Sequence, residues 1–224
     1  MTDLLVVTAV AAEADAVRAG ADPDLITVEP VGVGPAAAAV GTTRLLLRAE
    51  ADGRPYRAVL CAGIAGGFPG QAETGATVVG TRSVAADLGA ETPDGFLAVE
   101  ELGFGRSVID ADPALLRSLA SALPGCVVGD IVTLSTVTGT AATAAALVRR
   151  YPAAAAEAME GFAVATAAAE AGLPFVELRT ISNVIGPRDR GAWRLGEALA
   201  ALTNAAALMG GVGIATAKDA GVSG

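Results

Sequence analysis

Residues 156–165 read Ala-Glu-Ala-Met-Glu-Gly-Phe-Ala-Val-Ala, an acid-bearing start to an otherwise apolar helix predicted over residues 159–171. Glu160 has no basic residue near it in the sequence. Burying a lone carboxylate is costly unless donors hydrogen-bond to it, and the vicinal hydroxyls of a sugar are one such pair of donors. The alternative is an acid favoured by the helix dipole near an N-terminus. This stretch leaves both interpretations open.

On either side of this helix, short β-branched or leucine-rich runs alternate with longer alanine-rich runs, which is typical of strands that feed helices. We therefore predict an α/β fold in one domain, residues 1–224, with a mixed, mainly parallel central sheet flanked by helices. The predicted strands span residues 3–10, 25–31, 57–63, 76–84, 95–101, 126–137 and 174–182. The predicted helices span residues 12–19, 36–50, 112–122, 140–150, 159–171 and 192–210. Residues 86–95 and 186–192 contain Gly or Pro among polar residues and are predicted to be mobile loops.

The composition excludes several classes of function. The sequence is 53% hydrophobic but only 4% aromatic, so the core must consist largely of Ala, Val, Leu and Ile. A net charge of −9 without a basic stripe argues against a nucleic-acid partner. The absence of histidine removes Ser-His-Asp and Cys-His nucleophiles and the commonest zinc ligand, which leaves carboxylates and amides for catalysis. We expect no metal and no cofactor.

The compartment is predicted from the cysteines and the apolar segments. Cys61 and Cys126 lie far apart in apolar runs, which indicates buried free thiols in a reducing environment. The N-terminus lacks the basic start of a signal peptide, and its apolar run is too short to cross a bilayer. Residues 199–217 are apolar, but Thr203, Asn204 and several glycines favour a packed terminal helix. We expect a soluble, cytoplasmic protein with no membrane partner.

Unusual residues follow several predicted strands, and open α/β sheets bind ligands at the carboxyl ends of their strands. Glu13 follows the first strand, residues 32–34 the second, residues 63–67 the third, and Asn183 the strand that ends at Ser182. With Glu160 at a helix start, these positions predict one ligand site.

Two glycine-rich segments need separate interpretation. Gly32-Val33-Gly34 resembles half of a dinucleotide fingerprint, but it follows the second strand, and position 37 is Ala. A tight strand-to-helix turn without a ligand remains the alternative for this segment. Residues 63–67, Gly-Ile-Ala-Gly-Gly, predict a flexible loop whose backbone can approach a ligand. No Lys follows them, so they are not a phosphate-binding loop of the Gly-x-x-x-x-Gly-Lys type.

Three separated motifs carry a resemblance to a known family. Gly-Ile-Ala-Gly-Gly at 63–67, Ala-Met-Glu-Gly at 158–161 and Arg-Thr-Ile-Ser-Asn at 179–183 resemble the nucleoside phosphorylase and nucleosidase superfamily in order and spacing. The resemblance covers nearly the whole chain. Within the superfamily the chain is most similar to the futalosine hydrolase family of the alternative menaquinone pathway, with methylthioadenosine/S-adenosylhomocysteine nucleosidases as near relatives. The resemblance implies hydrolysis of the N-glycosidic bond of a 6-oxopurine nucleoside, with release of hypoxanthine, by a homo-oligomer that is a dimer or larger.

The resemblance also implies a role for individual residues. Glu13 matches the family's water-activating glutamate, and Glu160 matches the acid that binds the 2′- and 3′-hydroxyls of the ribose. Six further positions match segments that surround the nucleoside: Val10 and Val33 at the ribose and its 5′ side, Gly66 near the attacking water, Met159 under the ribose, and Val132 and Thr133 at the purine edge.

Asn183 stands where adenosine-type nucleosidases carry aspartate. A 6-oxopurine presents acceptors at both N7 and O6, so an amide NH₂ can donate there while a carboxylate would repel. Asn183 therefore favours hypoxanthine over adenine, and the alternative is an Asn that merely caps the following segment. Futalosine carries a carboxylated aromatic group at C5′, and Arg188 and Arg190 are candidate partners for it, with solvated loop charges as the alternative.

The rival functions are an adenosine-type nucleosidase, a purine nucleoside phosphorylase and a non-catalytic nucleoside-binding module. The arginines of the family's phosphorylases have no counterpart here, because Arg18, Arg44 and Arg54 do not stand at those positions. A glutamate at position 13 would also repel a phosphate dianion. Water is therefore the predicted nucleophile.

Overall fold

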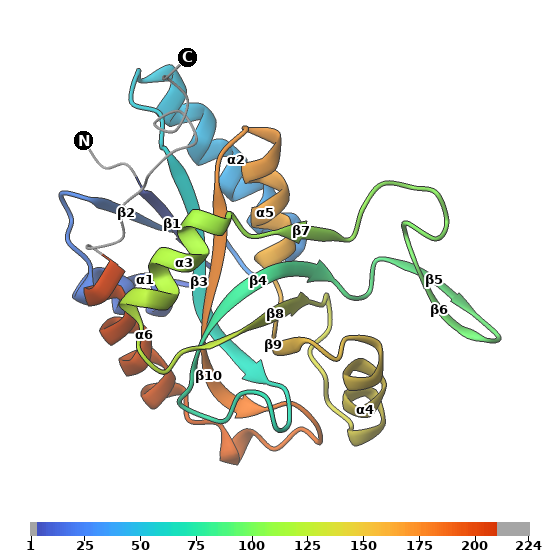
Figure 1. The fold of residues 1–224 in the computed structure, drawn as a ribbon. Helices are drawn as coiled ribbons and strands as arrows, with labels where there is room; N and C mark the ends of the chain where they lie inside the picture. Colours follow the sequence, from blue (N-terminus) through green and yellow to red (C-terminus); the bar gives the residue numbers. More distant parts are fainter. Residues whose placement is uncertain (1–3, 210–224) are drawn as a thin grey trace.

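The computed structural model describes residues 4–209 and confirms the α/β fold class (Figure 1). Its strands are β1 (Leu4–Thr8), β2 (Ile26–Pro30), β3 (Ala58–Gly67), β4 (Thr77–Ala85), β5 (Gly89–Thr92), β6 (Gly95–Ala98), β7 (Val108–Asp110), β8 (Val127–Thr133), β9 (Ala154–Ala158) and β10 (Phe175–Val184). Its helices are α1 (Ala11–Gly20), α2 (Pro35–Ala51), α3 (Pro113–Ala122), α4 (Ala141–Arg150), α5 (Gly161–Glu170) and α6 (Leu195–Met209), with a short 3₁₀ helix, η1 (Arg190–Ala192).

The main sheet is mixed and mainly parallel, as predicted. Its strand order is β10-β4-β8-β9-β3-β1-β2, and β7 pairs with β4. β10 also pairs with β3, so β3, β10, β4, β8 and β9 form a closed circuit rather than the open sheet that we expected. The closure brings the carboxyl ends of β3 and β10 next to β9, where the chemically unusual residues lie.

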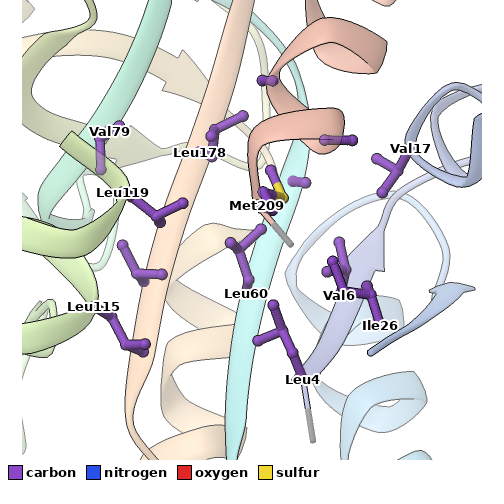
Figure 2. Close-up of a cluster of buried hydrophobic side chains, with 14 of the residues drawn as sticks. Leu4, Val6, Val17, Ile26, Leu60, Val79, Leu115, Leu119, Leu178 and Met209 are labelled. Atoms are coloured by element: carbon purple, nitrogen blue, oxygen red, sulfur yellow. The ribbon is translucent and has the colours of Figure 1, made fainter. Parts of the chain in front are cut away.

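Helices cover the sheet on two sides, and small side chains let them pack closely. α1, α3 and α6 surround an apolar cluster that includes Leu60, Leu178 and Met209 (Figure 2). α2 and α5 cover a second cluster on the other side of the sheet. Gly20 is an example: a Cβ there would lie 2.1 Å from the Thr203 carbonyl oxygen on α6. The close contact between α1 and α6 therefore requires glycine at this position.

The structure contains three strands that were not predicted, β5, β7 and β9, and it differs from the prediction most at β9 and at residues 63–67. Residues 154–158 form a buried strand, β9, which the alanine run did not predict because alanine has low β-propensity. As a result α5 begins at Gly161, with Glu160 as its N-cap. Residues 63–67 are not a loop but the last part of β3, and Gly66 and Gly67 pair with β9. The prediction of a flexible glycine loop there was wrong.

Other boundaries shift by a few residues. The strand predicted over 126–137 ends at Thr133, and residues 134–140 connect it to α4. The segment predicted as a mobile loop at 86–95 contains β5 and the start of the β5–β6 hairpin, which extends away from the sheet (Figure 1). Part of the apolar stretch 199–217 lies outside the described residues. Within residues 4–209, no helix is both long and apolar enough to cross a membrane.

Candidate active site

One cavity of about 410 Å³ lies where β1, β3, β9 and β10 end. Eight of the eleven residues predicted for the site line it, namely Val10, Glu13, Val33, Gly66, Met159, Glu160, Asn183 and Arg188. Positions 13, 160 and 183, which come from distant parts of the chain, therefore meet at one cavity.

Glu13 is fixed by backbone donors. It lies in the first turn of α1 and is only 4% exposed. Its Oε2 accepts hydrogen bonds from the N–H groups of Ala9 (2.9 Å) and Val10 (3.2 Å), and its Oε1 accepts one from Ile64 (2.9 Å). Each carboxylate oxygen has two lone pairs, so Oε1 retains one lone pair for a further donor. A water molecule in the cavity is a suitable donor.

Glu160 is also buried and receives donors from three elements. Its Oε1 accepts from the N–H of Gly34 (3.1 Å), and its Oε2 accepts from the N–H of Met159 (3.3 Å) and from Arg179 Nη2 (3.4 Å). Gly34 has φ of 86° and is the N-cap of α2. The turn at residues 32–34 therefore positions a donor for Glu160, which neither the dinucleotide interpretation nor the plain turn interpretation predicted.

Arg179 is the basic partner that the sequence around Glu160 lacks. It is 1% exposed on β10, and its Nε donates to Glu177 Oε1 at 2.9 Å. Ser83 donates to the other oxygen of Glu177. Burial raises the pKa of Glu177, while the charge of Arg179 acts in the opposite direction. Pairing with Arg179 is therefore what allows two acids, Glu160 and Glu177, to lie inside the protein.

Two glycines make room for these charged groups. A Cβ at Gly63 would lie 2.7 Å from Glu13 Oε1 and 2.8 Å from Arg179 Nη1. A Cβ at Gly161 would lie 2.0 Å from Glu177 Oε2. Gly63 belongs to the motif at 63–67 and Gly161 to the motif at 158–161. Glycine is needed at these two positions because charged side chains lie against the backbone there.

Both cysteines are free thiols, as predicted, and Cys61 lies beside this group. Its sulfur accepts a hydrogen bond from Arg179 Nη2 at 3.3 Å, and burial raises the pKa of its thiol well above the ordinary value. The thiol is therefore neutral at pH 7 and adds no charge to the cluster of acids. Cys126 is only partly buried.

Asn183 lies at the end of β10, where it faces the cavity. The hydroxyl of Ser182 donates to Asn183 Oδ1 at 2.8 Å, and Asn183 Nδ2 donates to the Val184 carbonyl at 3.1 Å. The amide nitrogen has two hydrogens and uses one of them for Val184, so the second N–H remains for a ligand. A Cβ at Gly66 would lie 2.7 Å from Ile185 Cγ2, so glycine keeps the surface beside Asn183 open.

Three predicted site residues lie outside the cavity lining. Val132 is fully buried among apolar side chains. Thr133 Oγ1 accepts a hydrogen bond from the N–H of Phe162 at 2.9 Å, next to the start of α5. Arg190 is exposed in η1. The segment after β8 does reach the cavity, but through Val137 and Thr138, because the strand ends four residues earlier than predicted.

Four residues that line the cavity or pair with its acids have no role assigned from the sequence, namely Arg179, Glu157, Thr138 and Trp193. For Arg179 the signal was present, because Glu177 and Arg179 stand two residues apart in an otherwise apolar strand and so share one face. For Glu157 the signal was an acid inside an alanine run, two residues before Met159. Its burial follows from β9, which the sequence did not predict.

Comparison with known proteins agrees with this fold. Residues 17–217 match the phosphorylase superfamily, and the chain belongs to this family. A futalosine hydrolase from Streptomyces coelicolor is 52% identical over 218 residues, which cover 90% of this chain and 92% of that protein. The resemblance stated from the sequence motifs is thereby confirmed.

Solved structures share the fold at low sequence identity. The native futalosine hydrolase of Helicobacter pylori has a TM-score of 0.78 with 18% identity, over 93% of this chain and 97% of that one. A methylthioadenosine/S-adenosylhomocysteine nucleosidase from Neisseria meningitidis, solved with methylthio-immucillin-A, also has a TM-score of 0.78, with 20% identity over 94% of this chain and 99% of that one. At these identities the structures establish the fold alone.

Proposed function

We propose that this protein hydrolyses the N-glycosidic bond of futalosine, releasing hypoxanthine and dehypoxanthine futalosine in the futalosine pathway of menaquinone biosynthesis. The observation that carries the proposal is the meeting of Glu13, Glu160 and Asn183 at one cavity. The 52% identity to a futalosine hydrolase supports the choice of substrate.

In the proposed reaction, Glu160 binds the 2′- and 3′-hydroxyls of the ribose and fixes its position. The C1′–N9 bond breaks as a C1′–O bond to water forms, with oxocarbenium character on the ribose. Glu13 orients the water and takes its proton, the departing hypoxanthine anion takes a proton from solvent, and Glu13 returns its own proton to solvent after the product leaves. Three backbone N–H groups hold the Glu13 carboxylate in place, so it needs no rearrangement to meet the water. The scheme follows the inverting logic of carboxylate glycosidases.

Asn183 stabilises the leaving base. Negative charge grows on N7 and O6 of the purine as the bond breaks, and the amide NH₂ donates to that edge. A well-aimed donor of this kind contributes about 3 kcal/mol to lowering the barrier.

The 5′ extension of futalosine is assigned to the side of the cavity lined by Arg188 and Trp193. The guanidinium carbon of Arg188 lies 6.0 Å from the centre of the Trp193 ring. A cation next to an aromatic ring suits a carboxylated aromatic group, which can stack on the ring and pair with the charge. Arg190 remains a second candidate, since it lies in η1 three residues before Trp193.

The remaining positions keep the roles that the resemblance implies. Val10, Val33 and Met159 surround the ribose and its 5′ side, and Gly66, which lines the same cavity, lies near the attacking water. Val132 and Thr133 act on the base only through the segment that follows them, which includes Val137 and Thr138. An aspartate at position 183 would suit an adenosine-type nucleosidase better, and Arg18, Arg44 and Arg54, which a phosphorylase would need nearby, are not among the cavity's lining residues.

One assay separates the candidate activities. Futalosine, inosine and methylthioadenosine are each incubated with the protein, with and without inorganic phosphate, and the free base is measured. We expect the fastest release from futalosine, independent of phosphate. Fastest release from methylthioadenosine, a requirement for phosphate, or tight binding without any release would each contradict the proposal.

We further propose that residues 1–224 form a single domain that acts as a soluble, cytoplasmic homo-oligomer, a dimer or larger, without nucleic-acid or membrane partners. The acidic composition and the family resemblance support this. Light scattering of the purified protein should give at least twice the chain mass of 21.9 kDa, and a monomer mass would contradict it.

A further inference from the structure

Glu157 and Asn183 lie on the same side of the sheet, one strand apart. Gly66 on β3 pairs in register with Glu157 on β9 and with Asn183 on β10. Residues in register on adjacent strands project to the same face, and neighbouring strands lie about 4.8 Å apart. The two side chains therefore flank a strand position that has no side chain of its own, and all three residues line the cavity.

The carboxylate of Glu157 has unused hydrogen-bonding capacity. Its Oε1 accepts from the N–H of Thr138 at 2.7 Å, and its Oε2 accepts from the Thr138 hydroxyl. One lone pair on each oxygen is left over. Glu157 is 4% exposed, and among residues 4–209 no ion pair involves it, whereas Glu160 and Glu177 share Arg179. Burial raises the pKa of Glu157, while the hydrogen bonds from Thr138 act in the opposite direction.

A cavity-lining carboxylate with spare acceptor capacity can accept a hydrogen bond from a ligand. Hypoxanthine has an N–H at N1, next to the acceptors O6 and N7, whereas adenine has a lone pair at N1. We propose that Glu157 determines base specificity by accepting a hydrogen bond from N1–H of the 6-oxopurine, while Asn183 donates to its O6 and N7 edge. This inference rests on the proposed function and adds to it a second selective contact, with Thr138 as the residue that positions the carboxylate.

The competing explanation is that Glu157 only anchors the 134–140 connection through Thr138. The two roles differ in their effect on substrate choice. An anchor affects every purine nucleoside alike, whereas an N1–H acceptor discriminates between 6-oxo and 6-amino bases.

The test compares Glu157→Gln with the wild type on futalosine and on its 6-amino analogue. We expect kcat/KM for futalosine to fall by about 10- to 100-fold, since a hydrogen bond to a charged group is lost. The value for the 6-amino analogue should stay the same or rise, because the Gln NH₂ can donate to N1. An equal fall on both substrates would overturn the inference.

Three further measurements keep the inference falsifiable. Thr138→Val removes the hydroxyl that helps to position the Glu157 carboxylate, so kcat/KM should fall more for futalosine than for the 6-amino analogue, but by a smaller factor than in Glu157→Gln. An equal fall on both substrates would show that Thr138 acts only as an anchor and would count against the assignment. Titration of free hypoxanthine and free adenine into the wild type and into Glu157→Gln requires no turnover. The substitution should weaken the binding of hypoxanthine relative to that of adenine. An unchanged ratio of the two dissociation constants would overturn the inference. If futalosine is not cleaved by the wild type, the proposed function fails, and this titration still decides the role of Glu157.

A probe on the wild type avoids the risk that a variant fails to fold. Inosine methylated at N1 lacks the N–H and should be hydrolysed at least 100-fold more slowly than inosine. Hydrolysis within a few-fold of inosine would contradict an acceptor at this position.

Discussion

The ribose end and the base end of the cavity are built differently. At the ribose end, Glu13 and Glu160 are held by backbone N–H groups and by the buried Arg179. At the base end, Asn183 and Glu157 have few partners and keep hydrogen-bonding capacity for a ligand. The ribose end is thus preorganised for a reaction common to all nucleosides, and the base end is left free to choose among them. Changes at the first should affect every substrate, and changes at the second should alter the ratio between substrates.

The largest expected effect is on stability, from Arg179→Met. This change leaves Glu160 and Glu177 buried without their cation, and breaking a buried pair in this way costs about 3–5 kcal/mol. The free energy of unfolding is measured by urea denaturation. Arg194→Met is the control, because it removes an exposed ion pair with Glu197 and should cost less than about 1 kcal/mol. Equal losses for the two variants would show that the buried network does not stabilise the ribose end.

Glu13→Gln tests the chemistry at the same end. Loss of a general base lowers kcat by about 10²–10⁴-fold, while glutamine keeps the size of the side chain and so the binding of substrate. The measurements are kcat for futalosine and the dissociation constant of a non-hydrolysable nucleoside analogue. Asp15→Asn, on the exposed side of α1, is the control. A kcat within a few-fold of wild type would remove Glu13 from the mechanism.

Asn183→Asp moves the test to the base end. The carboxylate repels O6 and N7 of hypoxanthine, so kcat/KM for inosine or futalosine should fall by about 100-fold, as for removal of an aimed donor. The fall on adenine nucleosides should be much smaller. If kcat/KM falls by the same factor for both classes of substrate, the assignment of Asn183 to the purine edge is wrong.

The smallest expected effect is the pH dependence of stability contributed by Glu157. Burial raises the pKa of Glu157 above its ordinary value of 4.5, so the folded protein holds the proton more tightly than the unfolded chain. The free energy of unfolding of the wild type should therefore decrease, relative to Glu157→Gln, as the pH rises from about 4.5 through the raised pKa. Urea denaturation of both proteins across this range measures the difference. A difference that is constant with pH would show that burial of the carboxylate has no cost.

The sequence predicted the parts of the fold that depend on hydrophobic periodicity and helix signals. α2, α3 and α4 appear within one or two residues of their predicted bounds, since Pro35, Asp112 and Thr140 mark their starts. β9 was missed because an alanine run favours helix, and only its burial between β8 and β3 makes it a strand. The closure of the sheet through β3 and β10 also depends on long-range pairing that no local pattern records.

The same division holds for the site. Glu13, Glu160 and Asn183 could be found from the motifs, and the structure brings them to one cavity. The ion pair of Arg179 with Glu160 could not be found from the sequence, because it joins two segments that are distant in the chain, β10 and the start of α5. The contact of Thr138 with Glu157 likewise depends on where β8 ends, and strand ends are poorly defined by sequence.

The central claim is that water, activated at the ribose end, cleaves futalosine. Its most direct test is to incubate the protein with futalosine in phosphate-free H₂¹⁸O and to separate the products by chromatography with mass detection. The account predicts free hypoxanthine and dehypoxanthine futalosine with one ¹⁸O at C1′. Release of a different base, absence of any release, or a product that forms only when phosphate is added would contradict it.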